Sequence, residues 1–282
     1  PWTIPQNRAI AFNPHIQYSL YRVDEVAEGS GAQAGELVIL ARNLAEQVLQ
    51  SAKAVRWTRL CSLSDLDAVI CSHPFHGLDG ANGEWDYPVP LLPGEHVTED
   101  AGTGFVHTAP SHGDDDYQLG LRFGLPMTYN VLEDGSYRPD LPLFGGQHII
   151  TPEGKEGPAN VSVIKALAHA GALFAKGKLK HSYPHSWRSK APLIYRNTPQ
   201  WFAAIDKPLA DGKGEYGNTI RKRALTSIEE LVTFTPISGR NRLHSMMEAR
   251  PDWVLSRQRA WGVPLTCFVK RGAKPTDPDF LL

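Results

Sequence analysis

One short stretch combines side chains suited to electrostatic or acid–base chemistry. Residues 102–117 read GTGFVHTAPSHGDDDY, in which the imidazole of His107 is followed by three consecutive carboxylates. The apolar run at 105–108 predicts a short strand, which Pro110 ends because proline cannot donate to a strand ladder. We expect a helix behind it, capped by Asp114, with Asp116 in a first turn whose dipole favours an ionised carboxylate. This strand–turn–helix would bring an imidazole and a carboxylate toward one small volume.

Each part of this stretch also has an ordinary structural interpretation. A single histidine on a strand is more often structural than functional, and acidic residues at a helix start are usually capping or solvated residues. A metal-dependent hydrolase is one alternative, because imidazole and carboxylate groups are common metal ligands. Its candidate ligands would be His107, His112, Asp114, Asp115 and Asp116. Against it, the histidine would project from a strand and the carboxylates from a helix, without an HExxH-like spacing.

The rest of the chain predicts short strands with occasional helices. This mixture favours an α+β domain or a β-barrel. Strands are expected near Arg8 and over 15–23, 36–41, 57–63 and 68–72, a hairpin turn over 133–137, and helices over 43–53 and 160–175, capped by Asn43 and Asn160.

Composition is that of an ordinary globular chain, with 41% hydrophobic and 21% charged residues. No apolar run reaches the ~20 residues of a membrane span, and three cysteines without CxxC spacing favour a reducing cytoplasm. The net charge of −1 is unevenly spread. Residues 73–140 hold twelve acidic side chains against two arginines, which fits a pocket for a cation or ammonium group. Residues 176–201 hold six basic side chains and no acid, which suits either an RNA backbone or a solvated ribbon.

The central stretch resembles the editing-site signature of isoleucyl-tRNA synthetases, written GTGxVHTAPxHGxDDY. Two further segments extend the resemblance: PWTxPxN at the start of the chain, and HPFHGLDG at 73–80, which is similar to HPFxGFD with Leu78 in place of Phe. The threonines that precede PWT in the family are absent from this sequence. In all, the resemblance runs from Pro1 to about Phe268.

The resemblance implies the roles of individual residues. Asp116 would grip the α-ammonium group of a bound aminoacyl ester, and His107 would face its side chain and exclude isoleucine. Thr3, with Asn7, would hold the terminal adenosine or the attacking water. Glycine backbone could approach the substrate closely because it has no Cβ. The remaining expected substrate-binding residues are Trp2, Gly102, Thr103, Gly104, Thr108, His112 and Asp115.

Two C-terminal segments also resemble parts of these synthetases. Residues 181–206 are similar to the return β-ribbon by which the editing insertion rejoins the synthetase body. Ser186 and Ser189 stand where some relatives carry zinc-binding cysteines, and His181 and His185 alone are too few ligands, so no metal is expected. Residues 250–268 resemble the start of the second half of the catalytic domain. HIGH-type and KMSKS-type motifs do not occur, so ligation with ATP and Mg²⁺ is expected only of a full-length enzyme, and no cofactor of this chain.

These observations predict an α+β fold, mostly a β editing barrel with flanking helices, a β-ribbon and a partial catalytic domain. The expected boundaries are 1–180 for editing, 181–245 for the return connection and 246–282 for the catalytic part. The expected reaction is hydrolysis of Val-tRNA(Ile), with the tRNA 3′ end and the rest of a synthetase as partners, and no membrane. The alternatives are a valyl- or leucyl-type editing domain, the metal-dependent hydrolase and a non-catalytic tRNA-binding module.

Overall fold

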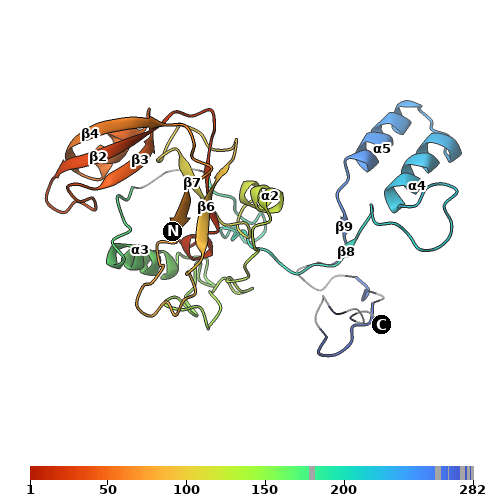
Figure 1. Ribbon diagram of the computed structural model, residues 1–282. Helices are drawn as coiled ribbons and strands as arrows, with labels where there is room; N and C mark the ends of the chain where they lie inside the picture. The colour runs from red at the N-terminus through yellow and green to blue at the C-terminus, as the bar shows by residue number, and fades with distance from the viewer. Residues whose placement is uncertain (178–181, 258–261, 266, 274–276, 278–279, 281–282) are drawn as a thin grey trace. The chain divides into compact units, whose positions relative to one another are not determined.

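The chain divides into two compact units, Pro1–Asn197 and Thr198–Leu282. The computed structural model describes residues 1–177, 182–257, 262–265, 267–273, 277 and 280 (Figure 1). His181 of the predicted ribbon lies outside the described residues. Within the described part of the chain, no helix is long and apolar enough to cross a membrane. Each unit is described by itself below.

The first unit contains two sheets. One is mixed and four-stranded, and its centre is β1, which pairs in parallel with β6 and antiparallel with β7 (Figure 1). The other is antiparallel and three-stranded, with irregular register between β2 and β4. In sheet order the strands are β5 (Ile70–Ser72), β6 (Pro88–Pro93), β1 (Ala9–Phe12) and β7 (Phe105–Thr108), then β3 (Leu37–Ala41), β2 (Tyr18–Val26) and β4 (Ala54–Leu63).

The helices of this unit are short. The α+β class predicted from the sequence is confirmed, and the described strands form separate sheets rather than one closed barrel. The three predicted caps are wrong: the N-cap positions are Leu44, Gly113 and Pro158, so Asp114 is the first residue of its helix. The helices are η1, a 3-10 turn (Ile4–Gln6), α1 (Ala45–Ser51), α2 (Asp114–Phe123) and α3 (Ala159–His169).

The largest apolar core of the first unit is built mainly from loop residues. Phe75, Trp85, Tyr137 and Phe144 are almost fully buried and contact one another through their rings. They come from segments 73–87 and 131–149. In the second segment, an antiparallel bridge between Val131 and Tyr137 confirms the predicted hairpin turn. Trp2 and Ile4 pack against this core, so the start of the chain is fixed by residues far away in sequence.

The second unit is small, and most of its described regular secondary structure is helical. An arginine joins its helices, since Arg221 donates to both carboxylate oxygens of Asp206 and to the carbonyls of Met247, Glu248 and Arg250 at the end of α5. The elements are β8 (Phe202–Ala203), which pairs with β9 (Trp253–Val254), α4 (Ile220–Thr226), the π-helix η2 (Ser227–Leu231) and α5 (Ser238–Glu248).

Candidate active site

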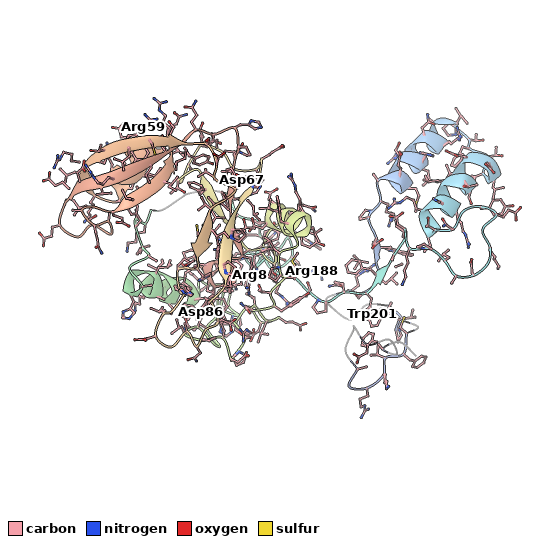
Figure 2. All side chains as sticks on the ribbon, viewed as in Figure 1. Arg8, Arg59, Asp67, Asp86, Arg188 and Trp201 are labelled. Atoms are coloured by element: carbon pink, nitrogen blue, oxygen red, sulfur yellow. The ribbon has the colours of Figure 1, made fainter. Side chains whose placement is uncertain are left out.

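The N-terminal segment 2–7 is held by side chains that donate to its carbonyl groups. Tyr137 Oη donates to the Trp2 carbonyl at 2.6 Å and Trp85 Nε1 to the Pro5 carbonyl at 2.9 Å. Tyr87 Oη donates to the Asn7 carbonyl at 2.8 Å. The guanidinium of Arg8, labelled in Figure 2, lies 4.0 Å from the centre of the Tyr87 ring, which keeps that ring in place.

Thr3 and His107 meet at the edge of the four-stranded sheet. The Thr3 hydroxyl oxygen lies 2.8 Å from His107 Nε2, and His107 is opposite Ile10 in the pairing of β1 with β7. Burial lowers the pKa of His107 to about 4, so the ring is neutral near pH 7. Its other nitrogen, Nδ1, is buried without a hydrogen-bond partner among the described residues. The sequence placed both residues in one site, and the structure brings them into contact.

Asp116 lies in the first turn of α2 and reaches back to the end of β7. Its Oδ2 accepts a hydrogen bond from the Ala109 amide at 2.8 Å, which ties the carboxylate to a point two residues after His107. Burial raises the pKa of Asp116, while the bond from Ala109 acts in the opposite direction. Asp114 and Asp115 are exposed. Of the three carboxylates, therefore, only Asp116 is anchored beside the strand.

Asn7 and Thr108 join the start of the chain to the same strand end. Asn7 Oδ1 accepts from the Thr108 amide at 3.2 Å, and the Arg8 amide donates to the Thr108 carbonyl at 2.8 Å. Both side chains are buried, and the Thr108 hydroxyl has no hydrogen-bond partner within the described residues. Asn7 thus fixes the backbone that carries His107.

His112 connects Trp2 with segment 182–197. Its Nδ1 lies 2.8 Å from the Tyr195 carbonyl, and the Trp2 ring meets its ring edge-on at 4.9 Å between centres. Because a carbonyl oxygen only accepts, Nδ1 carries the proton in the neutral ring and Nε2 has a free lone pair. Nε2 is buried and has no partner in the part of the chain that the structure describes.

Three predicted substrate-binding residues lie at the other end of β7. The Gly104 carbonyl accepts from Tyr18 Oη at 2.7 Å, and the Thr103 carbonyl accepts from the Ala41 amide at 2.9 Å. Gly102 precedes them with φ +80° and no atom within 4 Å of an added Cβ. From Gly104 to Thr108 the strand spans about 13 Å at ~3.3 Å per residue. The structure therefore separates Gly102, Thr103 and Gly104 from Thr3, Asn7 and Asp116.

The described part of the first unit carries a smaller and a larger cavity. One, of about 280 Å³, adjoins the start of α2 and is lined by Ser111, Gly113, Asp114, Tyr117, Tyr195, Arg196 and Asn197. A larger one, of about 740 Å³, is lined mainly by segments 12–18 and 62–67, near Asp67 in Figure 2. Neither cavity is lined by Thr3, His107 or Asp116.

Several residues that shape this site were not predicted from sequence. Tyr137, Asn160 and Tyr195 act through a hydroxyl, an amide and a carbonyl, and nothing in their sequence context indicates contact with segment 2–7 or His112. His73 also was not singled out, although it is the first residue of the HPFHG motif, and that motif could have pointed to it. Within the described residues, no group of three His, Cys, Asp or Glu side chains is arranged to hold a metal ion.

Comparison with known proteins gives consistent matches. Residues 23–276 match the family model of class I tRNA synthetases (I, L, M and V). An isoleucine–tRNA ligase of Ruegeria pomeroyi is 54% identical over 287 residues, covering 100% of this chain and 30% of that protein. One of Bradyrhizobium diazoefficiens is 48% identical, covering 96% and 28%. The chain thus spans under a third of the length of these relatives.

A solved structure described as "The crystal structure of GlLeuRS-CP1" is also similar to part of the chain. The sequence identity is 20% and the TM-score 0.32, over 49% of this chain and 51% of that one.

Proposed function

Because this chain belongs to the class I tRNA synthetases, we propose that it carries an editing reaction, the hydrolysis of valine from mischarged tRNA(Ile). The curated relatives named above are isoleucine–tRNA ligases, which supports the isoleucyl type over the valyl or leucyl type. The whole enzyme would ligate isoleucine to tRNA(Ile) with ATP and Mg²⁺ in the cytoplasm. The editing reaction of this chain needs no cofactor, because an aminoacyl ester is already activated toward water.

The physical need for this reaction comes from the size of one methylene group. A binding pocket gains only ~1–3 kcal/mol from one methylene, a limit for which isoleucyl-tRNA synthetases are the standard example. Valine therefore enters a site made for isoleucine, and a second, narrower site must remove it afterwards. In our proposal His107 narrows that second site, since a neutral ring held by Thr3 presents a rigid surface to the amino-acid side chain.

The observation that carries the proposal is the position of Asp116. One carboxylate oxygen is held by the Ala109 amide, and within the described residues no hydrogen bond is found for the other, which would accept from the α-ammonium group of valine. A charge-assisted hydrogen bond of this kind is roughly twice as strong as a neutral one. The ammonium group would lie beside the end of β7, with the side chain toward His107 on the same strand.

The chemical step in this proposal is attack by water on the ester carbonyl. A carbon–oxygen bond forms to water, the bond to the ribose oxygen breaks, and the ribose hydroxyl of tRNA leaves with a proton. Thr3 would orient the water and the terminal adenosine, and His112 would act through the Trp2 ring and the Tyr195 carbonyl that it contacts. Such positioning is a large part of what an activated ester needs. Trp2, Thr108 and Asn7 would act by holding these groups in place.

Deacylation of Val-tRNA(Ile) and Ile-tRNA(Ile) by the purified chain tests the proposal. We expect release of valine and little release of isoleucine, and the same rate after treatment with a metal chelator. Failure to hydrolyse either ester would contradict the proposal, and binding without hydrolysis would favour a tRNA-binding module. Inhibition by the chelator would favour a metal-dependent hydrolase instead.

A further inference from the structure

We propose that His73 is a positioning residue of the site, which holds segment 2–7 so that Thr3 meets His107. The inference rests on the proposed function, because Thr3 and His107 belong to the site argued there. His73 is only 2% exposed and lies in the HPFHG motif, directly after β5. It does not contact the substrate position itself, so its effect would pass through the backbone of Ile4.

Two hydrogen bonds fix the protonation state of His73. Its Nδ1 accepts from the Phe75 amide at 3.1 Å, and its Nε2 lies 2.9 Å from the Ile4 carbonyl. An amide only donates and a carbonyl only accepts, so Nδ1 is unprotonated and Nε2 carries the hydrogen. Burial also lowers the pKa of His73 to about 4, so the ring keeps this neutral form near pH 7.

The His73 ring is part of a larger clamp on the same segment. It stacks on Trp85 at 5.9 Å between ring centres, with 17° between planes, and meets Tyr87 edge-on at 5.6 Å. These two neighbours donate to the carbonyls of Pro5 and Asn7. Three adjacent side chains therefore hold three carbonyls of one short turn, and His73 holds the carbonyl nearest to Thr3.

The Ile4 carbonyl matters because it accepts two hydrogen bonds that stabilise the turn. It accepts from the Asn7 amide at 3.0 Å as well as from His73, while the Thr3 carbonyl accepts from the Gln6 amide at 3.0 Å. Loss of the His73 bond would release the residue that directly follows Thr3. The Thr3 hydroxyl would then move relative to His107, and a shift of ~1 Å at a reacting centre can cost about 10²-fold in rate.

Two variants of His73 separate positioning from general stability. H73N keeps an acceptor near the Nδ1 position for the Phe75 amide, but its side chain is too short to donate to the Ile4 carbonyl. H73Q keeps a donor that reaches that carbonyl and loses the acceptor. For Val-tRNA(Ile) we expect kcat to fall about 10- to 100-fold in H73N and to stay within about threefold in H73Q, with KM little changed in both. Equal kcat values for the two folded variants would overturn the inference.

A second readout does not depend on activity. The ¹⁵N chemical shift of His107 Nε2 reports its hydrogen bond with Thr3, and we expect it to change in H73N but not in H73Q. L49V is the matched control, because Leu49 is fully buried in the core between α1 and the three-stranded sheet and contacts none of these groups. It should lower stability without moving the His107 signal. An unchanged His107 signal in H73N would refute the positioning role.

The two proposals fail in different ways. If the wild-type chain does not hydrolyse Val-tRNA(Ile), the proposed function fails, while the His107 signal still decides the role of His73. If the wild type is active and T3V lowers kcat but H73N does not, only the inference about His73 fails. When both hold, H73N should add little to the loss already caused by T3V, because the two changes break the same arrangement.

Discussion

Thr3 Oγ1 lies 2.8 Å from His107 Nε2, although 104 residues separate the two in sequence. One group is carried by a turn at the start of the chain, the other by a strand that pairs with β1. Two hydrogen bonds support this contact. Tyr137 of the aromatic core donates to the Trp2 carbonyl beside the turn, and Asn7 accepts from the Thr108 amide at the end of the strand. The predictions below test what this arrangement does.

Removing the charge of Asp116 should abolish most hydrolysis. D116N keeps an oxygen for the Ala109 amide and so keeps the fold, but it loses the charge that would bind the ammonium group. A hydrogen bond to a charged group contributes ~1.5–3 kcal/mol, so kcat/KM for Val-tRNA(Ile) should fall at least about 10- to 100-fold. D115N is the control, because Asp115 is the exposed neighbour. Equal rates for D116N and the wild type in a deacylation assay would exclude the ammonium role.

Truncating His107 should broaden specificity. H107A removes the ring that we propose narrows the pocket, so the chain should begin to release isoleucine from Ile-tRNA(Ile). T3V is the comparison, because it removes the hydrogen bond to the ring without removing the ring, so it should broaden specificity less than H107A does. The measurement is the ratio of kcat/KM for the two aminoacyl-tRNAs. If H107A still discriminates as well as the wild type, another residue excludes isoleucine.

Stability should fall as the pH drops from about 6.5 to about 4. Burial lowers the pKa of both His73 and His107 to about 4, from an ordinary value of 6.5. In that window the unfolded chain takes up protons that the folded chain does not, so the stabilisation is complete above pH 6.5 and is lost on acidification. The free energy of unfolding should change by at most about 1.4 kcal/mol per pH unit for each histidine.

Urea unfolding between pH 4.5 and 7 measures this slope. The raised pKa of Asp116 acts in the opposite sense, because its folded form takes up a proton before the unfolded one does. In H73Q the unfolded chain should take up about one proton fewer relative to the folded chain, since glutamine does not titrate, and the slope should fall accordingly. A slope identical to that of the wild type would mean that His73 is not held neutral by the fold.

Two neighbouring glycines should respond differently to alanine. Both have φ +80°, where a Cβ is strained by ~1–2 kcal/mol. At Gly104 the added Cβ would also lie 2.3 Å from the Ala41 Cβ, whereas at Gly102 it would meet nothing within 4 Å. Overpacking adds about 1–3 kcal/mol, so G104A should destabilise the chain more than G102A. Thermal unfolding of the two variants checks the order, and equal losses would show that strain alone decides.

Some of this molecule could be predicted from local sequence because the relevant forces are local. Phe105–Thr108 is an apolar run ended by a proline, and it is the strand β7. The acidic run before an apolar pattern is the start of α2. The errors were also local: Asn43, Asp114 and Asn160 are good caps by type, but the backbone enters each helix at another residue. Capping contributes only about 1 kcal/mol, so tertiary packing outweighs it.

The sequence by itself determined that His107, Asp116 and Thr3 are candidate site residues and that the fold is α+β. Only the tertiary structure decided which candidates meet: Thr3 contacts His107, Asp116 is tied to Ala109, and Gly104 faces Ala41 at the far end of the strand. It also decided that His73 holds the turn. The physical reason is that these contacts depend on buried donors pairing with carbonyls far away in sequence. Each unpaired buried group would cost ~1–3 kcal/mol, and no local pattern records which partner satisfies it.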